Sequence, residues 1–266
     1  MLSFREIDCG LRQLSLEMNK PVIVHSALSA FGELRGGADT LLGALLANFK
    51  GVMMPAFTYK TMIVPETGPD NNGLIYGSGK DLNQMAVPFH EDMPADKLMG
   101  ILPETLRKMP EAERSSHPIL SFTGIGVENA LDAQTLENPL SPIGVLAGAD
   151  GWVLLLGVDH TVNTSIHYAE KLAGRRQFLR WALAQKQITA CPGFPGCSNG
   201  FNQIETTLNG LTIRTRIGKA EVQAIPLAPL LQIVADLVAE DHQALLCNNP
   251  ECDRCLAVRS APANGE

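Results

Sequence analysis

GWVLLLGVDHTVNTSIHYAE, residues 151–170, predicts a strand, a loop and a helix in immediate succession. The apolar run 151–157 is typical of a buried strand, residues 158–163 form a loop, and a helix follows. Residues i and i+3 share one face of a helix, so His167 and Glu170 can act on one substrate or on each other. A histidine in the first turn of a helix that follows a strand is a common mounting for a catalytic base. The alternative is a structural histidine that caps the helix or packs in the core.

The sequence on both sides of this stretch alternates helical and strand patterns. Apolar residues recur at helical spacing in 4–14 and 41–49, and short apolar runs at 21–25 and 52–54 indicate buried strands. Such alternation is typical of an α/β protein. The further elements that we expect are a helix at 98–109, a strand at 119–126, a short helix at 127–131, a strand at 211–217 and a helix at 226–239.

Residues 59–96 form the longest stretch without periodicity, with PETGPDNNG and scattered charges. A stretch of this length inside a compact domain is usually functional or disordered. We therefore expect a loop that covers the site, and we expect a second loop at 139–144.

Composition favours one large globular domain. The chain has 266 residues, of which 45% are hydrophobic and 18% charged, and no shift in composition marks a boundary, so we expect residues 1–266 to form a single domain. There is no apolar stretch of membrane-spanning length and no secretory signal pattern, so we expect a soluble, cytoplasmic protein. The net charge of −7, without a Lys/Arg cluster, argues against nucleic acid and membrane partners and leaves a cationic substrate open.

Cysteines gather in the last third of the chain, in CPGFPGC and CNNPECDRC. Clustered thiols in a cytosolic chain suggest zinc before disulfides, and one C-x-x-C pair has the spacing of a zinc knuckle. The other spacings are irregular, and Gly/Pro-rich loops often bury a free thiol as a small hydrophobe. We therefore consider a structural zinc site without favouring it, and predict a single domain with a Cys-rich segment at 247–266; the cysteines concerned are Cys191, Cys197, Cys247, Cys252 and Cys255.

Several common signatures are absent from the sequence. There is no G-x-G-x-x-G after a strand and no G-x-x-x-x-G-K-[ST] loop, so Rossmann cofactors and P-loop nucleotides have little support. A G-x-S-x-G nucleophile elbow is also missing, which argues against a serine hydrolase.

Two further motifs precede the opening stretch. VHSALSAFG (24–32) with GGA (36–38) combines a strand end, a serine-rich loop and a glycine pair before a helix. Backbone N–H groups and the positive end of a helix suit a pyrophosphate or a pantetheine amide. RSSHPILSFT (114–123) places an arginine, hydroxyls and an imidazole ahead of a strand, and by itself it is equally compatible with an ordinary capped loop.

In this order and at these separations, the three motifs resemble the aminoglycoside 3-N-acetyltransferase family. Its members show an HS-S-L loop with a GG-A helix start, an RS-HP-S segment and a VLLLGV segment followed by T-x-x-H-x-x-E. The resemblance covers about residues 22–170. It implies a single α/β/α domain around a mixed β-sheet, distinct from the GNAT acetyltransferases, that transfers acetyl from acetyl-CoA to an amine of an aminoglycoside, usually the 3-amino group.

The resemblance also implies roles for single residues. His167 is the expected general base and Glu170 its orienting partner, and the two upstream motifs are expected to hold coenzyme A. Ala27 departs from the family, which commonly has a second serine there, so one hydroxyl contact to the cosubstrate is in doubt. The expected cofactor-binding residues are His25, Ser26, Ala27, Leu28, Ser115, Ser121 and Thr123.

The chemistry agrees with these roles. An amine attacks a thioester only when it is neutral, so a base must accept its proton. A histidine whose pKa lies near the working pH is well suited to this and contributes on the order of 10²–10⁴ in rate. The thioester oxygen needs donors, which Ser121, Thr123 or backbone N–H groups would supply. Acidic side chains suit a polycation, although each taken singly is as readily a solvated surface carboxylate; the expected substrate-binding residues are Tyr59, Glu66, Asp70, Asp159 and Asn163.

Two alternatives remain open at the level of sequence. One is an acyl-CoA-dependent acyltransferase of the same fold that works on a different amine. The other is a zinc-stabilised binding module that uses the cysteines to contact a protein partner. The sequence is equally compatible with a monomer and with a homodimer.

Overall fold

A computed structural model of the chain describes residues 1–260. The last part of the predicted Cys-rich segment 247–266 therefore lies outside the described residues.

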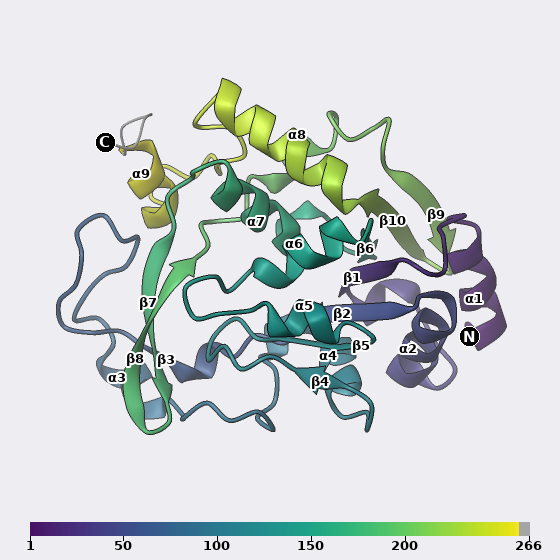
Figure 1. The fold of residues 1–266 in the computed structure, drawn as a ribbon, viewed down its shortest axis with the longest axis horizontal. Coiled ribbons are helices and arrows are strands. Elements are labelled where there is room, and N and C mark those ends of the chain that lie inside the picture. Colours follow the sequence, from purple (N-terminus) through teal and green to yellow (C-terminus); the bar gives the residue numbers. More distant parts are fainter. Residues whose placement is uncertain (261–266) are drawn as a thin grey trace.

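A seven-stranded mixed sheet forms the centre of the molecule (Figure 1). Strand β1 (Pro21–Ser26) lies in its middle and runs parallel to both neighbours, β2 (Gly51–Pro55) and β6 (Trp152–Leu156), whereas the remaining pairs are antiparallel. The order across the sheet is β4 (Glu113–Arg114), β5 (Phe122–Ile125), β2 (Gly51–Pro55), β1 (Pro21–Ser26), β6 (Trp152–Leu156), β10 (Ala220–Pro226) and β9 (Ile213–Ile217).

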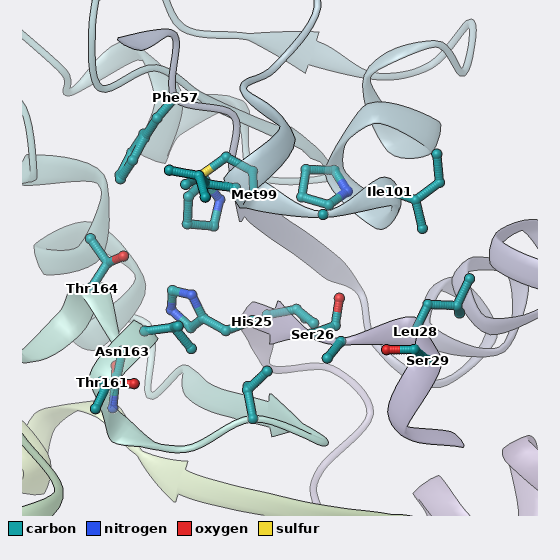
Figure 2. A pocket seen from close by; sticks show the side chains of 18 of the residues that line it. His25, Ser26, Leu28, Ser29, Phe57, Met99, Ile101, Thr161, Asn163 and Thr164 are labelled. Atoms are coloured by element: carbon teal, nitrogen blue, oxygen red, sulfur yellow. The ribbon is translucent and has the colours of Figure 1, made fainter. Parts of the chain in front are cut away.

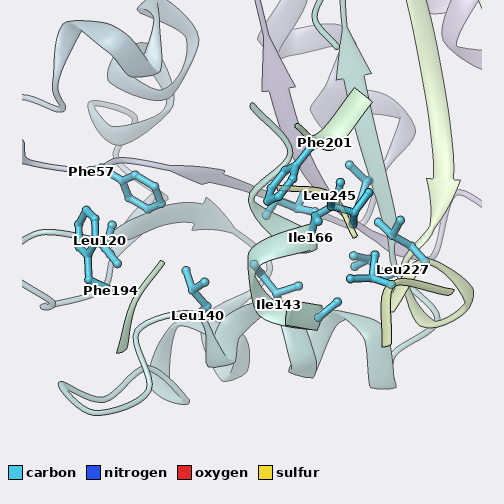
Figure 3. Packing of buried hydrophobic residues seen from close by; sticks show 14 of the residues in the cluster. Phe57, Leu120, Leu140, Ile143, Ile166, Phe194, Phe201, Leu227 and Leu245 are labelled. Carbon is cyan, nitrogen blue, oxygen red and sulfur yellow. The ribbon is translucent and has the colours of Figure 1, made fainter. Parts of the chain in front are cut away.

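Both faces of the sheet are buried at its centre, because alternate residues of β1, β2 and β6 enter different hydrophobic clusters. Val22 and Val24 of β1 face one cluster, whereas Ile23 faces the other, part of which Figure 3 shows. The first cluster includes residues from the helices α1 (Phe4–Arg12), α2 (Gly37–Asn48) and α4 (Ile101–Arg107). The second includes residues from α5 (Glu128–Asp132), α6 (Ser141–Gly148), α7 (Thr164–Leu172) and α8 (Leu227–Glu240). The predicted α/β/α sandwich around a mixed sheet is confirmed.

A second, three-stranded sheet lies beside the first and consists of β3 (Met62–Ile63), β7 (Phe178–Ala184) and β8 (Gln187–Phe194). It orders part of the stretch 59–96, where we expected only a loop. β3 pairs with β7, and the stretch also contains the helix α3 (Lys80–Met85). Strand β3 depends on a partner strand far away in the chain, so the local sequence carries no signal for it.

Most of the expected elements are present, with their ends shifted by a few residues. The loop expected at 139–144 is wrong in its second half, where α6 begins at Ser141. The hairpin β7–β8, strand β10 and the terminal helix α9 (Asp253–Arg259) were not expected. Within residues 1–260, no helix combines the length and the apolar character needed to cross a membrane.

The topology creates a site at the carboxyl ends of β1 and β6. The connection after β1 leads to α2 on one face of the sheet, and the connection after β6 leads to α7 on the other. Ligands bind at such switch points in α/β sheets because the diverging connections leave a crevice there. His25 and the segment before His167 are thereby brought together.

Candidate active site

His167 and Glu170 form a hydrogen-bonded pair on α7. The His167 Nδ1 and Glu170 Oε2 atoms are 2.9 Å apart, as the i, i+3 spacing predicts. Asn163 caps the helix, and its side-chain oxygen accepts a hydrogen bond from the backbone N–H of Ser165 at 3.2 Å. The cap fixes where the helix begins and therefore the direction in which His167 points.

Glu170 is buried and is held by Arg175, which the sequence analysis did not single out. Arg175 forms an ion pair with the second carboxylate oxygen of Glu170 and donates to the backbone oxygens of His242 and Ala244 at 3.0 and 2.8 Å. A buried carboxylate requires such a partner, because an unpaired charge is costly in the interior. The signal for Arg175 in the sequence was only its place directly after the helix.

The position of Glu170 determines the tautomer of His167. A carboxylate accepts hydrogen bonds only, so Nδ1 carries the proton and donates a hydrogen bond to Glu170 Oε2. Nε2 is then left with a lone pair. The ring also packs against Phe201, with centroids 4.6 Å apart at an interplanar angle of 61°. The imidazole is therefore oriented by both a hydrogen bond and an aromatic contact.

A cavity of about 950 Å³ opens beside His167 (Figure 2). One end is lined by His167, Asn163 and Thr164, and the other by the loop and 3₁₀ turn after β1. The facing wall consists of Phe57, Tyr59, residues 98–101 and Pro103. Its size and elongated lining suit an extended acyl donor together with an acceptor.

The first residue of α2 lines the far end of this cavity. Gly36 and Gly37 both have left-handed backbone angles, with φ of 80° and 58°. No side chain of the described residues caps the helix, and the N–H of Gly37 donates to Leu34 O at 3.3 Å. The N–H groups that follow it in the first turn have no intrahelical acceptor and are suited to a ligand. The positive end of a 12-residue helix is suited to bind phosphate groups.

His25 lies at the carboxyl end of β1 and lines the cavity between these two ends. Burial lowers the pKa of His25 to about 3, so the ring is neutral at physiological pH. Its Nε2 has no hydrogen-bond partner among the described residues. A neutral imidazole here can donate or accept one hydrogen bond to a bound molecule.

Comparison with known proteins identifies the family of this chain. The sequence model of the family described as aminoglycoside 3-N-acetyltransferase matches residues 23–239. The chain belongs to this family. The aminoglycoside N(3')-acetyltransferase-like protein YokD of Bacillus subtilis is 32% identical over 62% of this chain and 64% of its own length. The aminoglycoside N(3)-acetyltransferase VII of Streptomyces paromomycinus is 32% identical over 61% of this chain and 58% of its own length.

The matched stretch therefore spans less than two thirds of these curated family members. The fold likeness is more extensive. The crystal structure of the aminoglycoside acetyltransferase AAC(3)-IVa, as apoenzyme, superimposes with a TM-score of 0.79 and 23% identity, covering 97% of both chains. At this identity the likeness shows the shared fold.

The structure gathers several of the residues expected from the family resemblance. Those that line the cavity with His167 are His25, Ser26, Ala27, Leu28, Tyr59 and Asn163. Glu170 lies behind His167, out of the cavity. Ser29, Thr164 and Ser198 also line it, and the sequence analysis had not selected them. Serine and threonine in loops are too common for their type alone to predict a site.

Ser115, Ser121 and Thr123 do not line the cavity, contrary to the expected contact with coenzyme A. Their hydroxyl groups are engaged with the protein backbone: Ser115 Oγ accepts from Phe122 N at 2.8 Å, Ser121 Oγ donates to Ala56 O at 2.9 Å, and Thr123 Oγ1 donates to Glu113 O at 2.8 Å. The motif that contains them holds β5 against β2 and β4. In this arrangement the three hydroxyl groups serve the sheet, and their contact with the cosubstrate stays a prediction.

The expected acidic residues also lie outside the cavity lining. Asp159 caps the 3₁₀ turn His160–Val162 and accepts from Asn202 Nδ2 at 2.9 Å, and Glu66 and Asp70 belong to the long stretch before α3. Among residues 1–260, no acidic side chain lines the cavity. The walls of the site are therefore mainly apolar, with hydroxyl, amide and imidazole groups.

Proposed function

We propose that this protein is an acetyl-CoA-dependent N-acetyltransferase that acetylates an amine of an aminoglycoside, the 3-amino group in particular. One observation carries the proposal: the Nε2 edge of an oriented histidine shares a cavity with a helix N-terminus suited to phosphate groups. The named activity of the curated relatives supports it. So do two proteins of the same fold, AAC-IIIb, solved with CoASH, and AAC(3)-IVa, of which a mutant was solved with a gentamicin.

His167 acts as the general base in this proposal. The neutral amine nitrogen attacks the thioester carbonyl carbon, His167 Nε2 takes the amine proton, and the carbon–sulfur bond breaks. The thiolate of coenzyme A leaves and takes the proton back from the imidazolium, so that amide and free thiol are the products. Glu170 stabilises the imidazolium that forms, and Arg175 holds Glu170 in place through their ion pair.

The acyl donor is expected to lie along the cavity. Its pyrophosphate meets the N-terminus of α2, and its pantetheine arm follows His25, Ser26, Ala27 and Leu28 toward His167. Because Ala27 lacks a hydroxyl group, this contact relies on backbone groups. In this proposal, residues 1–266 form one catalytic domain, and the protein acts in the cytoplasm, where acetyl-CoA is available.

The acyl-transfer step is tested with His167→Ala and thiol release from acetyl-CoA. We expect kcat to fall on the order of 10²–10⁴-fold, with coenzyme A binding retained in calorimetry. His90→Ala, at a histidine away from the cavity, is the matched control and should retain full activity. Near wild-type turnover in His167→Ala would exclude the mechanism.

A second candidate is an acyltransferase of the same fold that acts on a less charged amine. The absence of acidic side chains from the cavity lining within residues 1–260 favours it, because a polycation gains most from nearby carboxylates. A panel of aminoglycosides and monoamines, each assayed for thiol release, separates the two candidates. If the protein acetylates the monoamines but not the aminoglycosides, the second candidate function replaces the first.

A further inference from the structure

Four cysteines from two separate segments of the chain converge behind the candidate active site. Cys197 follows β8, whereas Cys247, Cys252 and Cys255 belong to the C-terminal segment around α9. Their sulfur atoms all lie within 4.8 Å of one another, and Cys247 Sγ and Cys255 Sγ are 3.4 Å apart. All four are free thiols, three of them buried. Cys191, the fifth cysteine of this region, is not part of the group.

This arrangement matches the ligand set of a structural zinc ion. Zinc binds four thiolates tetrahedrally at about 2.3 Å, which separates the sulfur atoms by about 3.8 Å. Soft sulfur ligands select zinc over harder cations, and the Cys252-x-x-Cys255 pair has the spacing of a zinc knuckle. The spacings are irregular in the sequence because Cys197 joins the group only through the fold.

The surroundings also suit such an ion, which with four thiolates carries a net charge of about −2. Arg254 donates to the backbone oxygen of Gly196 at 2.8 Å, next to one ligand, and Arg259 donates to the backbone oxygen of Cys247 itself. These two guanidinium groups offset the charge, and their hydrogen bonds fix the loops that carry the sulfur atoms.

We propose that Cys197, Cys247, Cys252 and Cys255 bind one structural Zn²⁺, which fastens the C-terminal segment to the loop that follows β8. The metal site stands independently of the acetyl-transfer reaction. The ion then joins the loop after β8 to the C-terminal segment, and both of these parts of the chain support His167.

The fastened loops contact the active site from behind. Phe201, four residues after Cys197, packs on the His167 ring, and Figure 3 shows it beside Leu245. Residues 242 and 244, which precede Cys247, accept the hydrogen bonds of Arg175. Gly200 is required where the two segments meet, because a Cβ atom there would lie 2.4 Å from Leu245 O. Loss of the ion should therefore release both supports of the catalytic pair.

Metal analysis of the purified full-length protein tests the site directly. We expect about one zinc per chain by mass spectrometry of the metal, and the spectrum of a tetrahedral thiolate complex after growth with cobalt. Cys252→Ser should lower the zinc content at least severalfold, and Cys191→Ser should leave it unchanged. Cys191 is a fair control because it is a buried thiol outside the group, and burial raises its pKa to about 12.

The outcomes separate the metal site from the proposed reaction. Folded wild-type protein without bound metal, whether its four thiols are reduced or paired in disulfides, would overturn the zinc site even if acetyl transfer is fast. Bound zinc in a protein without acetyltransferase activity would leave the site standing and refute the proposed function. In active protein, we expect zinc removal to lower kcat severalfold while coenzyme A, held at the far end of the cavity, still binds.

Discussion

The orientation of the His167 imidazole depends on two charged residues, Glu170 and Arg175, that lie behind it. His167 opens to the cavity, Glu170 lies behind it, and Arg175 lies behind Glu170. Neither charged group is stable alone in the interior, since removing one partner of a buried ion pair costs about 3–5 kcal/mol. We therefore expect the ion pair to contribute both to the stability of the fold and to the orientation of the His167 ring.

Glu170→Gln tests the orienting role. We expect kcat to fall on the order of 10²-fold, because a neutral amide does not stabilise the imidazolium, whereas KM for acetyl-CoA should change little. The variant should also be less stable in urea, since Arg175 loses its partner. Adding Arg175→Met should recover much of that stability without recovering the rate. Recovery of both together would assign Glu170 a structural role only.

Because His117 is buried, we expect the protein to lose stability in mild acid. Its Nδ1 accepts from Ile119 N at 3.1 Å and Leu120 N at 2.9 Å, and burial lowers the pKa of His117 to about 4. The unfolded chain then binds the proton more tightly than the folded protein does. The contribution of His117 to the free energy of unfolding is therefore complete above about pH 6.5 and is lost as the pH falls toward 4. Between about pH 7 and pH 5, His117 should lower the free energy of unfolding by about 2 kcal/mol.

Urea unfolding at the two pH values measures this effect. His117→Asn keeps an acceptor close to the position of Nδ1 and does not titrate, so it should lose less stability on acidification than the wild type. An equal loss in both proteins would assign the acid sensitivity to other groups.

At the scale of elements, the site depends on where strands end and helices begin. The carboxyl ends of β1 and β6 lie side by side, with Ser26 paired to Leu156. The connection after β1 delivers the N-terminus of α2 to the cavity, and the connection after β6 delivers the N-terminal part of α7. The proposed donor site and the proposed base thus lie at the starts of two helices.

Gly37→Ala tests the contact between α2 and the acyl donor. Nothing lies within 4 Å of a Cβ atom at this position, so the methyl group would extend into open space beside the cavity. We expect KM for acetyl-CoA to rise on the order of 3- to 10-fold with kcat unchanged at saturation, corresponding to a loss of about 1 kcal/mol in binding. Gly77→Ala, at another left-handed glycine outside the cavity, controls for backbone strain. Equal KM values in both variants would remove α2 from the donor site.

At the scale of the whole molecule, the net charge of the protein and the lining of its cavity contribute differently to the attraction of a cationic substrate. The net charge is −7, yet no acidic side chain lines the cavity within the described residues 1–260. Attraction of a polycation would therefore come from the overall field rather than from contacts in the site.

Salt should reveal this long-range attraction. KM for an aminoglycoside should rise severalfold between low ionic strength and about 0.3 M salt, because the Debye length falls below about 10 Å. KM for a monoamine should change much less, and KM for acetyl-CoA is measured in parallel as the reference. A salt-independent KM for the aminoglycoside would contradict the long-range attraction.

The sequence by itself determined the α/β layers, because the helical and strand periods of apolar side chains are local properties of the chain. It also determined the pairing of His167 with Glu170, which follows from the i, i+3 geometry of one helix. The loop after β1 was predicted from resemblance, and His25, Ser26, Ala27 and Leu28 do line the cavity.

Only the tertiary structure decided which residues far apart in the sequence meet. The partner of Glu170, the engagement of Ser115, Ser121 and Thr123 with the backbone, and the order of β3 within 59–96 all depend on long-range contacts. The convergence of Cys197 with Cys252 and Cys255 is of the same kind. The local sequence determines which way a side chain faces along its own helix or strand, but contacts between distant segments are determined by how those elements pack.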